Sequence, residues 1–96
     1  MKELLIAENT VPKENGMPLH LSYYLVSELL MDDRGCPVCE MYGARIEKDA
    51  EGAPPVSRRI PGITMLRGEI VRIVRSLSEH AVMPETMVEC LEGLLP

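Results

Sequence analysis

Apolar and polar residues alternate along the first 60 residues, which is the period expected of half-buried β-strands. The clearest stretch is PLHLSYYLVSE (residues 18–28), where every second residue from Leu19 to Leu25 is apolar and His20 falls on the outer face. VCEMYGARIEK (38–48) repeats this pattern, and ELLIAENTV (3–11) and VSRRI (56–60) are weaker candidates. The pattern predicts an antiparallel meander of three or four strands.

Turn residues separate these segments. Asn15-Gly16 is the dipeptide that most readily takes the positive φ angles of a tight hairpin, and Asp32–Gly35 is a second hairpin signal. The loop DAEGAPP (49–55) turns the chain again, and its prolines place the strand that follows at a sheet edge.

After Gly62 the apolar residues from Ile63 to Leu77 recur at spacings of three and four, which indicates a helix, with Thr64 available as its N-cap. HAVMP (80–84) breaks this helix. Pro84 then opens a second helix of about ten residues, which is too short to be stable in water without docking on the rest.

These patterns predict a single α+β domain over residues 1–96, with residues 1–16 as a peripheral strand and turn and both helices packed on one face of the sheet. The predicted core joins alternate strand residues to the helix stripes. It comprises Leu21, Tyr23, Leu25, Tyr42, Ala44, Ile46, Leu66, Ile70, Ile73, Val74, Leu77, Met87, Val88 and Leu91.

Composition narrows the class of protein. The chain is 46% hydrophobic without Phe or Trp, so we expect a folded domain with an aliphatic, methionine-rich core. No apolar run approaches the roughly 18 residues of a membrane span, and the acidic amino terminus lacks a signal-peptide pattern. An odd number of cysteines, three, favours reduced thiols. We therefore expect a cytoplasmic protein without a cofactor.

The pair Cys36 and Cys39 has the C-x-x-C spacing of zinc knuckles and redox couples. A closed zinc site needs a second pair, and a redox couple normally opens a helix, whereas EMYGARIEK (40–48) has the pattern of a strand. In a regular strand, residues 36 and 39 face opposite sides, so we predict reduced thiols without metal. The alternative is a β-turn at 36–39, through which two protomers could share one zinc ion and form a zinc-bridged dimer.

Residues 58–75 carry a local charge of +4 in a chain whose net charge is −5. The arginines responsible are Arg58, Arg59, Arg67, Arg72 and Arg75. They are candidates for an anion-, RNA- or partner-binding surface. The acidic total and the absence of a basic recognition helix argue against general nucleic-acid binding, and a solvated helix face explains Arg72 and Arg75.

No catalytic constellation emerges from the sequence. Ser76 and His80 are four residues apart on one predicted helix but lack an orienting acid and an oxyanion donor. We therefore predict no enzymatic activity and no catalytic residues.

Four segments resemble a known pattern: SYYLVSE, YGARIEK, RRIPGIT and the tail EIVRIVRSLSEHAVMPETMVECLEGLL. Over residues 18–95 the chain resembles an uncharacterised domain-of-unknown-function family of short proteins from anaerobic Gram-positive bacteria. The resemblance implies two helices joined through a proline corner and brings no activity or site residues. The Cys36–Cys39 pair departs from it.

The sequence thus favours a small, non-catalytic cytoplasmic interaction or regulatory module. An apolar interface is predicted at Cys90, Leu94 and Leu95, because one short helix cannot turn all its apolar residues toward the sheet. The expected partner is another protein or a second copy of the chain, with no membrane association.

Overall fold

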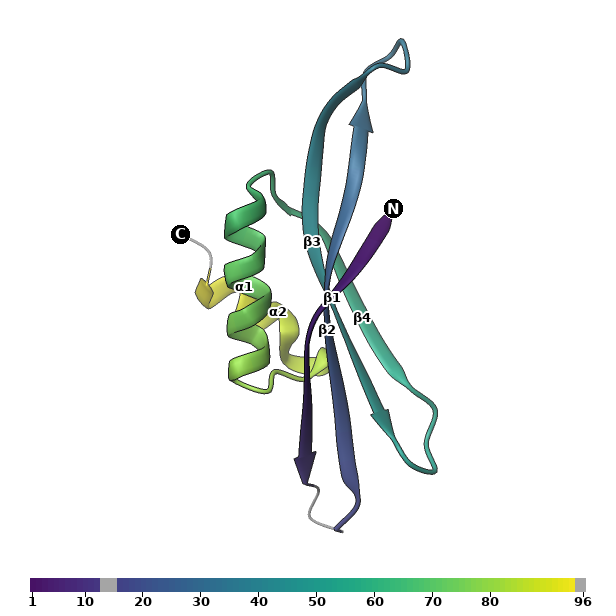
Figure 1. Cartoon of the computed structure of the whole chain (residues 1–96), viewed down its shortest axis with the longest axis vertical. Helices are drawn as coiled ribbons and strands as arrows, with labels where there is room; N and C mark the ends of the chain where they lie inside the picture. Colours follow the sequence, from purple (N-terminus) through teal and green to yellow (C-terminus); the bar gives the residue numbers. More distant parts are fainter. Residues whose placement is uncertain (13–15, 95–96) are drawn as a thin grey trace.

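The computed structural model describes residues 1–12 and 16–94 of the chain. Four antiparallel strands form one sheet in the order β1-β2-β3-β4, and both helices lie on one face of it (Figure 1). The strands are β1 (Lys2–Pro12), β2 (Pro18–Met31), β3 (Pro37–Ala50) and β4 (Val56–Thr64). The predicted α+β meander followed by two helices is confirmed.

The strand register decides which side chains face the helices. Tyr23 pairs with Ile46 and Leu25 pairs with Ala44, so alternate residues of β2 and β3 share the covered face. Their neighbours, including Tyr24, lie on the opposite face, as the alternating pattern predicts. The first strand is an edge strand that pairs with β2 from Lys2 to Pro12.

Of the predicted Asn15-Gly16 turn, Asn15 lies outside the described residues. Gly16 has a φ of 82°, in the left-handed region that favours glycine.

The fourth strand is longer than the sequence predicts. It continues past Ile60 to Thr64 through an irregularity in its pairing with β3. A Cβ atom at Gly43 would lie closer than 3.0 Å to backbone atoms of Ile60 and Pro61. Glycine at position 43 therefore allows the irregular part of β4 to approach β3 closely.

The helices are α1 (Arg67–Glu79) and α2 (Met87–Leu94), and a 3-10 turn, η1 (Pro84–Thr86), precedes α2. The predicted change to a helical pattern directly after Gly62 is wrong, because residues 63 and 64 belong to β4. Thr64 is not the N-cap of α1: its hydroxyl accepts a hydrogen bond from the Leu66 N–H at 3.1 Å, and Leu66 occupies the cap position without a side-chain cap.

The buried core joins both layers, and two residues depart from its prediction. Leu66 is 67% exposed, because the extended cap position lies outside the helical stripe that faces the sheet. Val88 is only half-buried, since α2 turns Met87 and Leu91, four residues apart, toward the core. All other predicted core residues are buried, and Val82 joins them.

The carboxyl end of α1 closes with a left-handed residue. The Val82 N–H donates to the Leu77 carbonyl at 3.0 Å, and Ala81 between them has a φ of 49°. This six-to-one hydrogen bond belongs to the Schellman type of helix end, which usually places glycine at the left-handed position. It turns the chain back toward the sheet, so that Val82 reaches the core.

Polar contacts fasten the turns after α1 to the sheet. The Tyr23 hydroxyl, in the middle of β2, donates to the Val82 carbonyl at 3.0 Å, and burial raises the pKa of Tyr23 to about 12. Lys48 of β3 forms an ion pair with Glu85 of η1. These contacts hold the helix layer at a fixed position over β2 and β3.

Candidate functional site

β2 and β3 extend beyond both of their neighbours at one end of the sheet. The pairing of β1 with β2 ends at Lys2 and Ser27, and that of β4 with β3 ends at Thr64 and Tyr42. Residues 28–41 therefore form a two-stranded extension, here called the ribbon, which projects from the body of the molecule (Figure 1). With it, the molecule measures 54 × 28 × 19 Å.

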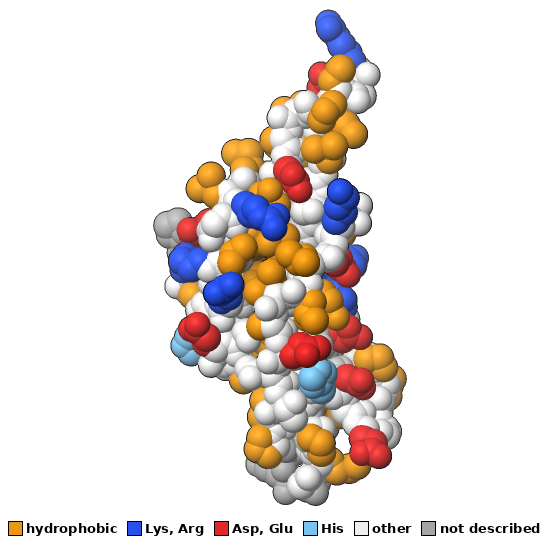
Figure 2. All heavy atoms as spheres, viewed as in Figure 1, with side chains coloured by type: hydrophobic (Ala, Val, Ile, Leu, Met, Phe, Trp, Pro, Cys, Tyr) orange, Lys and Arg blue, Asp and Glu red, His pale blue; other side chains and the backbone are white. Residues whose placement is uncertain are grey.

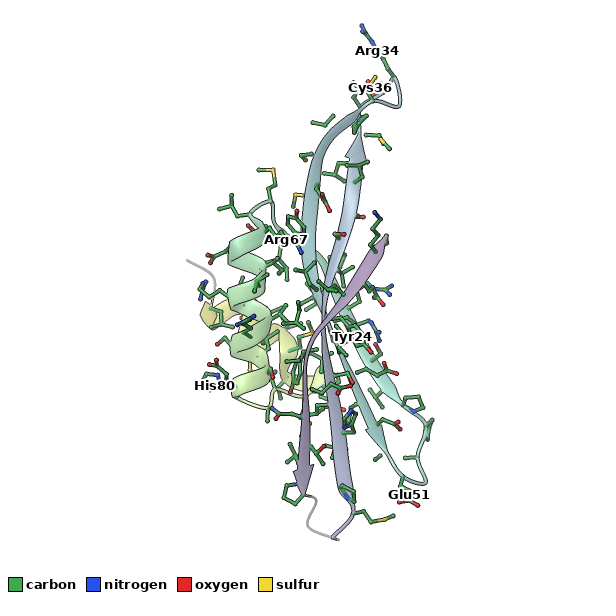
Figure 3. The ribbon with its side chains drawn as sticks, viewed as in Figure 1. Tyr24, Arg34, Cys36, Glu51, Arg67 and His80 are labelled. Atoms are coloured by element: carbon green, nitrogen blue, oxygen red, sulfur yellow. The ribbon has the colours of Figure 1, made fainter. Side chains whose placement is uncertain are left out.

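The tip of the ribbon is set by Asp32. Its Oδ1 accepts hydrogen bonds from the backbone N–H groups of Arg34 and Cys36, each at 2.9 Å. The Gly35 N–H donates to the Asp32 carbonyl at 3.0 Å, with a φ of 79° at Gly35. The predicted Asp32–Gly35 turn is thus confirmed, and Arg34 and Cys36 lie at the tip (Figure 3).

Large apolar side chains of the ribbon lie in water. Leu29 is 52% exposed, Met31 is 56% exposed and Val38 is 66% exposed. Met65 and Leu66, which follow the last pairing of β4 at the base of the ribbon, are exposed as well. Figure 2 shows hydrophobic side chains both along the projecting ribbon and at the adjoining end of the helix layer. We call this set the ribbon surface: Leu29, Leu30, Met31, Val38, Met65 and Leu66.

The ribbon is acidic as well as apolar. Residues 28–41 contain four carboxylates, Glu28, Asp32, Asp33 and Glu40, and one arginine, giving a charge of −3. At its base, Lys2 and Arg67 line a hollow together with Glu40 and Leu25. The ribbon therefore combines exposed apolar side chains with a net negative charge, and two cations lie at its base.

The opposite face of the sheet carries a charged network centred on Arg45. This arginine donates to Glu3 at 3.0 Å and to Glu47 at 3.2 Å, and its guanidinium lies 4.1 Å from the centre of the Tyr24 ring. Arg59 donates to the same Glu3 carboxylate at 2.6 Å. Hydrogen bonding by Arg59, opposed in part by desolvation and aided by Arg45, lowers the pKa of Glu3. The network ties β1 to β3 and β4, so its role is structural.

Arg45 is a structural residue that the sequence patterns do not single out. Its partners, which include the Ser57 hydroxyl of β4, come from all four strands, so sequence spacing alone does not connect them. Of these contacts, the sequence indicates only the one with Glu47, because the alternation of β3 places Arg45 and Glu47 on one face.

The five arginines of residues 58–75 do not converge. Arg58 and Arg59 are adjacent in β4 and pair with Ile46 and Arg45, so they face opposite sides of the sheet. Arg72 forms an ion pair with Glu69 on α1. Binding of an anion or RNA by these arginines stays a prediction. Arg58 and Arg59 lie on opposite faces of the sheet, so the five arginines do not share one binding surface.

Arg67 and Arg75 lie toward opposite ends of α1. Arg67 is at the base of the ribbon, and Arg75 lines a hollow with Ile6 and Glu79.

The cysteine pair lies at and near the tip of the ribbon, where β3 begins. Cys36 is exposed in the turn, and Cys39 is half-buried opposite Leu30. The register shifts between Leu30 and Met31, so Val38 is an additional residue on β3. This bulge invalidates the argument that regular strand alternation separates the two thiols.

All three cysteines are free, and within the described residues no three His, Cys, Asp or Glu side chains lie together in a way that could hold a metal. The reduced, metal-free state of Cys36 and Cys39 stays a prediction, as does the alternative zinc-bridged dimer.

The predicted apolar interface near the carboxyl end is partly packed. Cys90 and Leu94 are half-buried against the core and line a cleft between α1 and α2 with Ser76 and His80. Leu95 lies outside the described residues. The His80 Nδ1 lies 2.8 Å from the Ser76 carbonyl oxygen. This contact of the imidazole with the backbone caps the end of α1 and does not activate the Ser76 hydroxyl.

A family of unknown function, DUF6514, matches residues 2–95, which is nearly the whole chain. The chain belongs to the DUF6514 family. This agrees with the resemblance to a domain of unknown function inferred from the sequence, and the match spans all four strands, both helices and the ribbon.

The DUF6514 match assigns no activity. No curated protein and no solved structure matches the chain. In the part of the chain that the structure describes, the two α-helices have 13 and 8 residues, too short to span a bilayer, which takes about 20 residues.

Proposed function

We propose that this DUF6514 protein is a small, non-catalytic cytoplasmic module that binds another protein through the ribbon surface. The observation that carries the proposal is the exposure of Leu29, Met31 and Val38 on an extension that the core does not need. No residue from 28 to 41, all of them described, belongs to the buried core.

Six of the large apolar residues that are exposed lie on the ribbon and at its base, whereas Leu4, Leu5 and Val56 are exposed on β1 and β4. Within the ribbon, Leu29 and Met31 lie on the face that the helices cover further along the sheet, and Leu30 lies on the other face. Single apolar side chains are common on protein surfaces, whereas a contiguous apolar patch often marks an interface. Leu29, Leu30, Met31 and Val38 lie on two paired strands, and Met65 and Leu66 adjoin their base. A partner that covered this group would remove the apolar side chains from water, which favours association.

The free thiols are consistent with the proposed compartment, because disulfides are rare in the reducing cytoplasm. The proposed partner is a protein rather than a nucleic acid, because the ribbon charge of −3 would repel phosphates.

Site-specific photocrosslinking in the cells that make the protein tests the proposal. A photoreactive amino acid replaces Val38 on the ribbon or, as a matched control, Glu51 in the turn at the opposite end of the sheet (Figure 3). We expect a discrete heterologous adduct from position 38 and none from position 51.

The double substitution Leu29→Glu with Met31→Glu should abolish that adduct while leaving the thermal unfolding midpoint unchanged, since both residues are exposed. The proposal is wrong if position 38 gives no adduct, if both positions give the same one, or if the adduct survives the double substitution.

A further inference from the structure

We infer that the partner binds as an added β-strand along the outer edge of β2 at residues 28–31, and that this strand carries alternating apolar and basic side chains. The inference rests on the proposed function and specifies its binding mode and the chemistry of the partner.

Among the described residues, no strand pairs with the outer edge of β2 beyond Ser27, and Met1 and Lys2 line a hollow with Glu28 and Leu29 at its beginning. Pairing with β1 ends where Lys2 meets Ser27, and β2 continues to Met31 with β3 on its other side only. A strand edge presents unpaired N–H and C=O groups that can bond to an extended peptide. An added strand here would continue the line of β1 along the ribbon.

The other edge of the ribbon is blocked. On β3, Pro37 has no N–H to donate, and the bulge at Val38 interrupts the regular spacing of backbone groups. Proline and bulges are among the features by which natural sheets prevent edge pairing. The β2 segment Glu28–Met31 contains no proline and no glycine, and the additional residue of the bulge lies on β3. The β2 edge is therefore the one open to addition.

The side chains of β2 specify what the added strand must carry. Leu29 and Met31 belong to the face that the helices cover further along the sheet, whereas Glu28 and Leu30 belong to the other face. Residues opposite Leu29 and Met31 would be apolar, and a residue opposite Glu28 would be basic. Glu40, paired with Leu29 across the ribbon, places a second carboxylate on the face of Leu29 and Met31.

Charge distinguishes this partner from a second copy of the chain. Pairing two β2 edges would bring together two ribbons that each carry −3. A segment containing lysine or arginine meets no such repulsion and is attracted from a distance. The edge thus fits a basic and apolar segment of a different protein.

The test uses two synthetic peptides of alternating residues, one of lysine and valine and one of glutamate and valine, added to the intact protein at physiological salt. We expect the lysine peptide to bind at least about tenfold more tightly. Substituting Glu28→Lys should weaken its binding by a similar factor, and the matched substitution Glu51→Lys should not.

Amide hydrogen exchange followed by NMR then separates the modes of binding. Strand addition slows exchange of outward-facing amides within residues 28–31 and leaves residues 38–41 unchanged. Tight binding without that protection overturns strand addition but leaves the ribbon surface as the docking site. Failure of the lysine peptide to bind, with the Val38 crosslink still present, overturns the partner chemistry alone. Loss of the crosslink overturns the proposed function itself.

Discussion

At the scale of single residues, Glu3 joins the edge strand to the rest of the sheet. Its carboxylate accepts hydrogen bonds from Arg59 and Arg45, and these contacts lower its pKa from the usual 4.5. A carboxylate whose pKa is lowered by folding stabilises the native state above its unfolded pKa. This contribution is lost as the pH falls through the folded value.

We therefore predict that Glu3→Gln lowers the thermal unfolding midpoint at pH 7 and that its difference from wild type vanishes as the pH is lowered from 7 through the folded pKa of Glu3. Melting curves recorded at intervals over this pH range measure the effect. A difference that stays constant over this range would show that the Glu3 charge contributes nothing, and Glu51→Gln serves as a control at an exposed turn.

Ala81 is the one described residue other than glycine with a positive φ, 49°. A side chain costs energy in this conformation, whereas glycine adopts it freely but loses more chain entropy on folding. We expect Ala81→Gly to raise the free energy of unfolding by about 0.5 to 1 kcal/mol, measured by urea denaturation. A destabilised variant would mean that the apolar contact of the Ala81 methyl outweighs the conformational cost.

At the scale of elements, the start of α1 determines which of its leucines are buried. Leu77 lies within the helical stripe and is 1% exposed, whereas Leu66 caps the helix and is exposed. Leu77→Ala should cost about 2 to 5 kcal/mol of unfolding free energy, and Leu66→Ala should change it by less than about 0.5 kcal/mol. Urea denaturation of both variants checks the pair. Equal costs would contradict the observed start of α1.

The elements that sequence alone predicts well are those with a long, regular period. Alternation identified β2 and β3, and the spacing of three and four identified the buried stripe of α1. The boundary between β4 and α1 was missed because Ile63 fits both periods. Its assignment depends on the close approach of β4 to Gly43, which is a tertiary contact.

At the scale of the whole molecule, the candidate site depends on relative strand lengths. The turn at Asp32–Gly35 was predictable from its residues. That β1 and β4 stop short of it was not, because the overhang follows from pairing between segments far apart in the chain. The exposed apolar residues of the ribbon were not foreseen, because they depend on that overhang. The sequence instead pointed to the terminal helix for an apolar interface, which stays a prediction.

The central claim is that the ribbon serves binding and not folding. Replacing residues 28–41 by the two-residue turn Asn-Gly would join Ser27 to Tyr42, which already face each other across β2 and β3. We predict that this shortened chain melts within a few degrees of wild type, about the effect of 1 kcal/mol or less, because the removed residues lie outside the core.

The decisive measurement is partner capture by the shortened chain, with the photoreactive residue placed at Leu66, beside the base of the missing ribbon. The account predicts an adduct at position 66 in the full-length protein and none in the folded, shortened one. A shortened chain that still captures the same partner, or one that fails to fold, would contradict it.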